Sequence, residues 1–195
     1  DSFGEYLFDA LEPGTYSVRF LVPAGWEFTG SDAGSDDLLD SDANPVSGVT
    51  APITVVSEED QFGWDAGFVR RAIVGDFVWN DQNGNGVQEA GEPGLAGALV
   101  ELLDGTGAVI ASRTTDTTGA YEFANLLPGS YSIRVTPPAG AWKFSDMNTG
   151  TDGTLDSDVD PNGRSAAFLL VSGQTDRTRD AGLFEPVDLA IQKTT

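Results

Sequence analysis

The sequence contains neither cysteine nor histidine. Without cysteine there can be no disulfide framework and no thiolate ligand, which excludes the usual zinc and iron–sulfur centres. Without histidine the chain lacks the commonest general base, the usual partner of a serine or cysteine nucleophile, and the commonest transition-metal ligand. The composition therefore argues against an enzyme, and it leaves hard oxygen ligands, which suit calcium or magnesium.

Basic residues are also scarce. The 195 residues include 10 Lys and Arg against 31 Asp and Glu, a formal net charge of −21. Such a surface is a poor partner for nucleic acid and for anionic membranes, and it attracts divalent cations. The sequence has no long apolar run of the kind that spans a bilayer. We therefore expect calcium ions as partners, and neither nucleic acid binding nor membrane insertion.

One stretch of twelve residues, 81–92, has the ligand spacing of an EF-hand calcium loop. Oxygen-bearing side chains stand at its positions 1, 3, 5, 9 and 12, and Gly86 stands at position 6, where such a loop turns sharply. The alternative is a plain acidic turn, because Asn-Gly is an ordinary turn signal. The agreement of all these positions favours calcium. The predicted ligands are Asp81, Asn83, Asn85, the backbone carbonyl of Val87, and Glu92.

The residues around this loop indicate strands and not helices. The segment 72–79 is rich in β-branched and aromatic residues, which favour strands. Pro93 follows Glu92 and disfavours a helical backbone at the glutamate. We therefore expect a calcium loop on a β framework, and not the helix–loop–helix of a calcium sensor.

The chain repeats itself at an offset of 115 residues, or 116 in its middle part. Residues 11–19, for example, match 126–134, and residues 65–68 match 180–183. A period this long indicates tandem domains and not a solenoid. The predicted organisation is the later part of a first module over 1–68, a complete module over 69–185, and over 186–195 a linker with the start of a following β domain.

The complete copy contains seven strand-like segments and no window of helical periodicity. In 130–136 apolar and polar residues alternate, which is typical of a half-buried strand. Seven short strands with frequent turns predict an all-β fold, an immunoglobulin-like β-sandwich. The predicted strands are 72–79, 97–103, 107–114, 120–124, 130–136, 165–171 and 176–183.

The first copy is expected to be incomplete, because it has no counterpart of the first strand, the calcium loop and the next two strands. Half a sandwich leaves unpaired strand edges and an uncovered apolar face. Our hypothesis is that a neighbouring chain or a separate fragment supplies the missing strands.

A second acidic segment occurs in both copies. Asp156, Asp158 and Asp160 alternate along the chain, so in an extended segment they share one side, where a hard cation would relieve their repulsion. The alternatives are a solvated acidic loop and the paired carboxylates of a glycoside hydrolase, which this alternation does not favour. Three further aspartates lie near the strands, namely Asp76, Asp180 and Asp65. They complete a coordination shell or are simply exposed. The remaining predicted ligands are Asp152 in the complete copy, and Asp36, Asp40, Asp42 and Asn44 in the first copy.

Several long motifs together resemble a known family. They span 75–86, 92–97, 115–123 and 127–131, and they are similar to the B domain of serine-aspartate repeat adhesins, within the collagen-adhesin (Cna) B-type group. The resemblance implies an extracellular bacterial stalk module in which several calcium ions make a tandem array rigid and protease-resistant. It also implies that the loop ligands and the alternating aspartates bind these ions. Asn85 departs from the family, which usually has aspartate there, and this difference should weaken the site.

Taken together, the residues and the resemblance predict a calcium-binding structural spacer in a secreted or cell-surface bacterial adhesin, next to other modules of the same chain. One alternative is a domain that grips a ligand or glycan through calcium. Another is an accessory module of a secreted enzyme.

Overall fold

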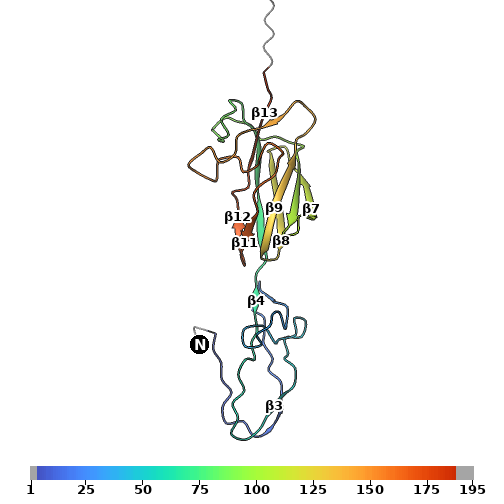
Figure 1. Cartoon of the computed structure of the whole chain (residues 1–195), viewed down its shortest axis with the longest axis vertical. Helices are drawn as coiled ribbons and strands as arrows, with labels where there is room; N and C mark the ends of the chain where they lie inside the picture. Colours follow the sequence, from blue (N-terminus) through green and yellow to red (C-terminus); the bar gives the residue numbers. More distant parts are fainter. Residues whose placement is uncertain (1–3, 188–195) are drawn as a thin grey trace, which may run out of the picture. The chain divides into compact units, whose positions relative to one another are not determined.

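The computed structural model describes residues 4–187, and within this range the chain is entirely β, with thirteen short strands. It divides into two compact units, Asp1–Arg70 and Arg71–Thr195 (Figure 1). The predicted all-β class is confirmed. Among the described residues there is no helix that could serve as a membrane span. The linker and following strand predicted over 186–195 lie almost wholly outside the described residues.

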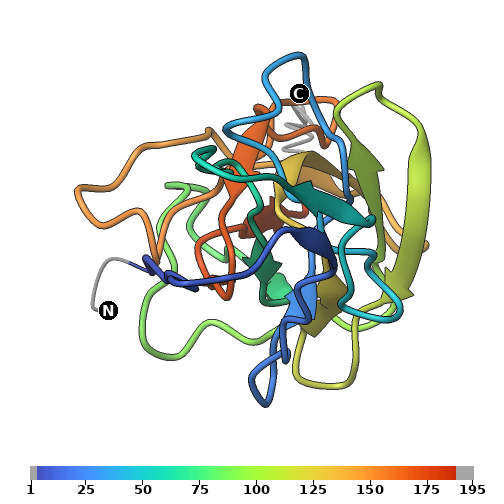
Figure 2. The same ribbon diagram turned by 90° about the horizontal axis from the view of Figure 1, so that it is seen from below.

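The second unit contains two sheets. In the first sheet β5 is central, with β8 antiparallel to it and β12 and β13 both parallel to it. The second sheet has the order β11-β9-β6-β7, so that β7 lies at an edge beside β6 (Figure 2). The first sheet comprises β5 (Ala72–Asn80), β8 (Ala120–Leu126), β10 (Lys143–Phe144), β12 (Thr175–Asp176) and β13 (Ala181–Phe184). The second comprises β6 (Leu99–Asp104), β7 (Val109–Thr114), β9 (Gly129–Thr136) and β11 (Phe168–Leu170).

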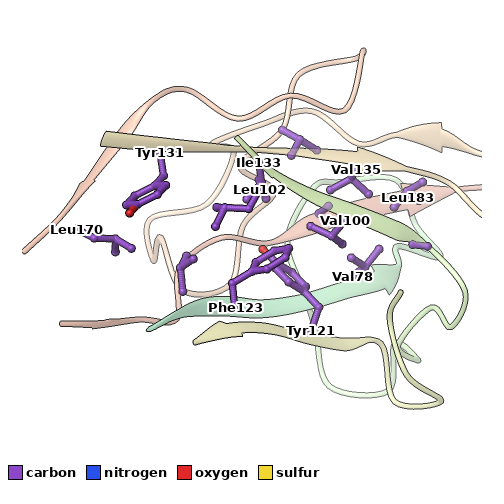
Figure 3. Packing of buried hydrophobic residues seen from close by; sticks show 14 of the residues in the cluster. Val78, Val100, Leu102, Tyr121, Phe123, Tyr131, Ile133, Val135, Leu170 and Leu183 are labelled. Atoms are coloured by element: carbon purple, nitrogen blue, oxygen red, sulfur yellow. The ribbon is translucent and has the colours of Figure 1, made fainter. Parts of the chain in front are cut away.

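The core of the second unit lies between these sheets (Figure 3). Val78 of β5 and Phe123 of β8 come from one sheet, and Leu102 of β6 and Ile133 of β9 come from the other. Every second residue of β9 is buried, as its alternation predicts. Burying one such side chain stabilises the fold by about 1.5–3 kcal/mol, so this interface holds the sandwich together. The predicted immunoglobulin-like sandwich is confirmed.

The prediction of a single strand over 176–183 was wrong. The structure has two short strands there, β12 and β13, which pair with different parts of β5. Between them the Asp180 carboxylate, and not a backbone carbonyl, accepts the hydrogen bond of the Phe77 N–H, at 3.2 Å. A side chain thus replaces part of the ladder, and the strand is interrupted. The two-residue strand β10 was missed because two residues carry no alternation.

The first unit repeats the later part of this fold. Its pairs β1–β3 and β2–β4 correspond to β9–β11 and β10–β13, with the same register. Gly14, for example, lies opposite Val55 just as Gly129 lies opposite Leu170. The repeat in the sequence is therefore also a repeat in structure. The strands of this unit are β1 (Gly14–Tyr16), β2 (Glu27–Phe28), β3 (Ile53–Val55) and β4 (Phe68–Val69).

Within its described residues the first unit has no counterpart of β5, β6 or β7. Residues 5–11 match β8 in sequence but form no strand, because β8 depends on β5 for its ladder. Phe8 is consequently 62 % exposed, whereas its counterpart Phe123 is 1 % exposed. The hypothesis that a neighbouring chain or a fragment completes this unit stays a prediction.

Glu58 is expected to destabilise the first unit through its backbone conformation. Its φ is 65°, in the left-handed region, and its counterpart in the second unit is Gly173, with φ 73°. A non-glycine residue with this φ costs about 1–2 kcal/mol. Glycine removes this cost, but part of the gain is offset because glycine gives the unfolded chain more conformational entropy. We expect Glu58→Gly to stabilise the first unit by about 0.5–1 kcal/mol.

Hydrogen exchange of peptides from the first unit, compared between the original chain and Glu58→Gly, measures this gain. Gly173→Glu is the matched control, and it should destabilise the second unit. Faster exchange in the first unit of Glu58→Gly would contradict the prediction.

Candidate metal centre

The loop that follows β5 is closed around Asp81, which is fully buried. One carboxylate oxygen, Oδ1, accepts hydrogen bonds from the Gly84 N–H at 2.7 Å and the Asn85 N–H at 3.2 Å. The other, Oδ2, accepts one from the Gly86 N–H at 2.8 Å. Both glycines have positive φ, 72° and 77°, which lets the backbone curl so that successive N–H groups reach one carboxylate.

The other predicted ligands of this loop hold its backbone in the same way. Asn83 Oδ1 accepts from the Asn85 N–H at 2.9 Å, and Asn85 Oδ1 accepts from the Val87 N–H at 2.8 Å. Glu92 closes the far end, because its carboxylate accepts from the Gln82 N–H at 2.9 Å. The structure therefore gathers the oxygens that the spacing predicts into one closed loop. Their assignment as calcium ligands stays a prediction.

Glu89 belongs to this loop but was not among the predicted ligands. Its two carboxylate oxygens accept hydrogen bonds from the side-chain amides of Asn83 at 2.9 Å and Asn85 at 2.7 Å. The signal that points to it is position 9 of the loop, from which a side chain often reaches calcium through a water molecule.

The second acidic segment packs against this loop. Val87 and Asp156 form an isolated antiparallel bridge, and the Ser157 N–H donates to the Gly86 carbonyl at 3.1 Å. The Asp81 N–H also donates to the Leu183 carbonyl of β13, at 2.9 Å. The two acidic loops and the end of β13 thus meet at one end of the second unit (Figure 1).

Beside this junction lies a cluster of carboxylates, formed by Asp76 on β5, Asp156 and Asp158 in the second acidic segment, and Asp180 between β12 and β13. The last three are only 4 %, 8 % and 1 % exposed. The Asp180 N–H donates to Asp158 Oδ2 at 3.0 Å, which ties two of them together. Burying several like charges in one place opposes folding unless something compensates them.

The protonation of this carboxylate cluster reflects that cost. Burial raises the pKa of Asp180 to about 9, and the neighbouring charges of Asp76 and Asp158 add to the effect. Burial also raises the pKa of Asp158 to about 6, although the Asp180 N–H and the Arg179 guanidinium favour its charged form. The pKa of Asp76 is raised, again mainly by burial. The cluster therefore favours binding of positive charge.

Two oxygens of the carboxylate cluster have no hydrogen-bond partner among residues 4–187. They are Asp156 Oδ1 and Asp180 Oδ2, and both are buried. Arg179 lies nearby, with Nη1 3.3 Å from Asp158 Oδ1 and Nε 3.3 Å from Asp176 Oδ2.

Arg177 acts on Asp76, where its positive charge opposes the rise that burial causes in the pKa, but it also pairs with Glu122. Two guanidinium groups therefore face more carboxylates than they can neutralise. Uncompensated hard oxygens are the kind of donor that calcium prefers. Among the described residues, however, three acidic residues bring ligand oxygens within 4.8 Å of one another only in the first unit, at Asp32, Asp37 and Asp42.

Asp152 and Asp160 are engaged in turns of their own. Asp152 Oδ1 accepts from the Thr154 N–H at 3.0 Å and from its hydroxyl at 2.6 Å. Asp160 Oδ1 accepts from the Asn162 and Arg164 N–H groups, at 2.8 and 2.9 Å. These bonds lower the pKa of both carboxyl groups. Of the three alternating aspartates, two therefore join the carboxylate cluster while Asp160 closes a turn.

In the first unit three other carboxylates converge. One oxygen each of Asp32, Asp37 and Asp42 lie within 4.8 Å of one another. Only Asp42 was among the predicted ligands, and burial raises its pKa. The pKa of Asp40 is also raised, first by burial and then by its acidic neighbours. Asp32 and Asp37 were not among the predicted ligands, because the sequence alone does not show the path of the loop that brings them beside Asp42.

The remaining predicted ligands of the first unit are exposed. Asp36 Oδ1 accepts from the Leu38 N–H at 3.2 Å, and Asn44 Oδ1 accepts from the Ser47 N–H at 3.0 Å, so both close turns. The Asp65 N–H donates to Asp42 Oδ2 at 2.6 Å, as the Asp180 N–H does to Asp158. Unlike Asp180, however, Asp65 is exposed.

The fold and the acidic loops define a small immunoglobulin-like module with candidate cation sites at one end. The family model of the SdrD B-like domain matches residues 1–68 and 72–183. The chain therefore belongs to the SdrD B-like domain family.

The curated relatives agree with this assignment. Serine-aspartate repeat-containing protein C of Staphylococcus aureus strain N315 is 37% identical over 187 residues, which are 95% of this chain and 18% of the relative. The same protein of strain Newman is 36% identical over the same share. The chain thus spans less than a fifth of the length of these relatives.

Among solved structures, the Bacillus anthracis TIE protein is similar with a TM-score of 0.44 at 16% identity, over 89% of this chain and 25% of that one. The Streptococcus agalactiae minor pilin GBS52 also has a TM-score of 0.44, at 11% identity, over 94% of this chain and 87% of that one. Likeness at this level carries no further conclusion.

The resemblance predicted from the motifs is thus confirmed. The chain contains B-type sequence in two copies and is part of a bacterial cell-surface protein, and its family is one of structural domains and not of enzymes.

Proposed function

We propose that the chain is a calcium-stabilised spacer in a bacterial surface adhesin. The observation that carries this proposal is the pair of buried, unpartnered oxygens, Asp156 Oδ1 and Asp180 Oδ2, within a group of like charges. A hard cation bound among these carboxylates would offset their repulsion. The residues that would hold such ions are Asp76, Asp156, Asp158 and Asp180 in one set, and Asp81, Asn83, Asn85, Val87 and Glu92 in the other.

When bound, calcium would supply positive charge to these two sets of residues. Which parts of the chain the ion holds together depends on where those residues lie. The carboxylate cluster joins β5, the second acidic segment and the β12–β13 junction. The loop around Asp81 is tied to β13, the last strand among the described residues of the second unit. An ion bound only by the folded form stabilises it by about 2.7 kcal/mol at a hundredfold excess over Kd. Stiffening the end of the second unit at β13 suits a spacer that holds neighbouring modules apart.

The alternative of calcium-dependent ligand or glycan binding needs an ion with an open coordination position facing solvent. In the carboxylate cluster Asp156, Asp158 and Asp180 are all buried, and this burial favours the structural role there. In the loop 81–92, Asn83 and Asn85 are exposed. The accessory role on a secreted enzyme would use the same spacer property.

Thermal melting of the whole chain in millimolar calcium and in chelator tests the proposal. A gain of about 2.7 kcal/mol corresponds to a rise of roughly 10 °C for a module of this size. We expect that rise in the original chain and a smaller one in Glu92→Gln, which weakens the loop's terminal ligand.

Glu122→Gln is the matched control, because it removes the same charge from an exposed ion pair with Arg177. Exposed pairs contribute little to stability, so this variant should keep the full response to calcium. Equal melting temperatures with calcium and with chelator in the original chain would rule out the calcium-stabilised spacer.

A further inference from the structure

The sequence contains three Asn-Gly dipeptides, and two of them lie in the loop 81–92, at Asn83–Gly84 and Asn85–Gly86. Because glycine has no side chain to obstruct it, its backbone nitrogen can approach the preceding asparagine closely. We propose that Asn83 and Asn85 are deamidation sites, which the closed loop protects and which react when the loop opens.

The reaction begins when the glycine backbone nitrogen attacks Cγ of the preceding asparagine. A bond forms between that nitrogen and Cγ, the bond from Cγ to the side-chain nitrogen breaks, and ammonia leaves with the proton that the glycine nitrogen gives up. The product is a succinimide. Water then opens either of its two carbonyl–nitrogen bonds and leaves aspartate or isoaspartate. No oxidant, reductant or metal takes part.

The closed loop holds both attacking nitrogens away from this reaction. The Gly84 N–H donates to Asp81 Oδ1 at 2.7 Å, and the Gly86 N–H donates to Asp81 Oδ2 at 2.8 Å. Asp81 is fully buried, which shields its oxygens from water. These bonds fix the direction of each N–H, so the backbone must turn before the nitrogen can bond to Cγ.

Both side-chain amides are held as well. The amide nitrogens of Asn83 and Asn85 donate to opposite oxygens of Glu89, at 2.9 and 2.7 Å. Their carbonyl oxygens accept from backbone N–H groups two residues further along, at 2.9 and 2.8 Å. Rotation of either side chain toward its glycine breaks two hydrogen bonds, and Glu89 couples the two sites.

The third dipeptide, Asn162–Gly163, is held less firmly. Its glycine N–H donates to the Asp160 carbonyl at 2.8 Å, but the Asn162 amide nitrogen makes only a long contact of 3.4 Å to Asp160 Oδ2. No contact of Asn162 depends on Asp81 or Glu89, so this site serves as an internal reference.

The two products would change the loop in opposite ways. Aspartate at position 85 adds a carboxylate to a loop that already holds Asp81, Glu89 and Glu92, which strengthens its attraction for cations. Isoaspartate adds a methylene to the backbone and displaces Gly86 from Asp81. Either product would therefore show, irreversibly, that the loop had opened.

The test incubates the whole chain with chelator at mildly alkaline pH and follows each asparagine by mass spectrometry of proteolytic peptides. Incubation in guanidinium chloride gives the unprotected rate. If reaction needs the open loop, the native rate is the unprotected rate multiplied by the open fraction. We expect Asn83 and Asn85 to react at least about tenfold more slowly in the native chain. Glu89→Ala, a change at an exposed residue, should raise both rates severalfold and leave Asn162 unchanged.

Equal native and unfolded rates at Asn83 and Asn85 would overturn the proposal. So would an unchanged rate at both sites in Glu89→Ala. A parallel rise at all three asparagines in that variant would also overturn it, because it would show that global unfolding, and not this loop, controls the reaction.

Discussion

Replacing Asp180 by asparagine is expected to raise the melting temperature of the second unit when no divalent cation is present. Asp180 is 1 % exposed, and its Oδ2 has no partner among the described residues. Burial and acidic neighbours raise its pKa to about 9, so at neutral pH the chain must take up a proton to fold. Asparagine has the same shape, keeps an acceptor for the Phe77 N–H, and needs no proton.

The same carboxyl groups should make stability depend on pH. The folded pKa values, about 9 for Asp180 and about 6 for Asp158, lie above the ordinary 3.8. Their contribution to stability is therefore complete below pH 3.8 and is lost as pH rises through the folded values. With chelator, we expect the melting temperature to fall from about pH 5 to about pH 8 in the original chain and to fall less in Asp180→Asn.

Calcium should reverse the order of the melting temperatures of the original chain and Asp180→Asn. The original chain gains stability because an ion compensates the ionised carboxylates, whereas Asp180→Asn has lost one ligand and gains less. Thermal melting at two pH values, with chelator and with calcium, measures all of these effects.

Asp104→Asn is the matched control. Hydrogen bonds from Thr106 lower the pKa of Asp104, so this change should destabilise slightly and leave the calcium response intact. A lower melting temperature of Asp180→Asn in chelator, with no response of either protein to calcium, would rule out a cation site in the carboxylate cluster.

Gly86→Ala is expected to separate the two acidic loops. Gly86 has φ 77°, and a Cβ at this position would lie 2.3 Å from the Asp146 carbonyl oxygen and 2.6 Å from Thr149 Oγ1. The left-handed backbone costs an alanine about 1–2 kcal/mol, and overpacking adds about 1–3 kcal/mol. We therefore expect a loss of roughly 2–5 kcal/mol in the free energy of unfolding, together with a weaker response to calcium.

Gly84→Ala distinguishes the cost of the left-handed backbone from the cost of the clash. Gly84 has φ 72°, but a Cβ there would meet only Phe184 Cγ, at 3.9 Å. This control carries the backbone cost without the clash. Denaturant unfolding and hydrogen exchange over residues 145–158 compare the variants. Equal losses in both would show that the contact between the loops contributes nothing.

Much of the fold could be predicted because its signals are local. The alternation in 130–136 marks a strand with one buried face, and β9 has that pattern. The split of the last predicted strand could not be foreseen. It depends on the contact between Phe77 and Asp180, which are 103 residues apart, and no short window of sequence carries that contact.

The loop 81–92 was determined by the sequence itself. Its carboxylate, amides and glycines lie within twelve residues, and Asp81 reaches its last partner, Gly86, only five residues away. Hydrogen bonds over so short a distance need little from the rest of the fold, so the spacing of the residues is enough to predict a closed loop.

The carboxylate cluster was decided by tertiary structure. Asp65 and Asp180 occupy the same Asp-Ala-Gly motif in the two copies, and both N–H groups bind the matching aspartate. Only Asp180 is buried, because β5 lies beside it in the second unit, and the described residues of the first unit have no such strand. Local sequence fixes the hydrogen bond. Burial, and with it the raised pKa and the demand for a cation, depends on a strand about a hundred residues away in the chain.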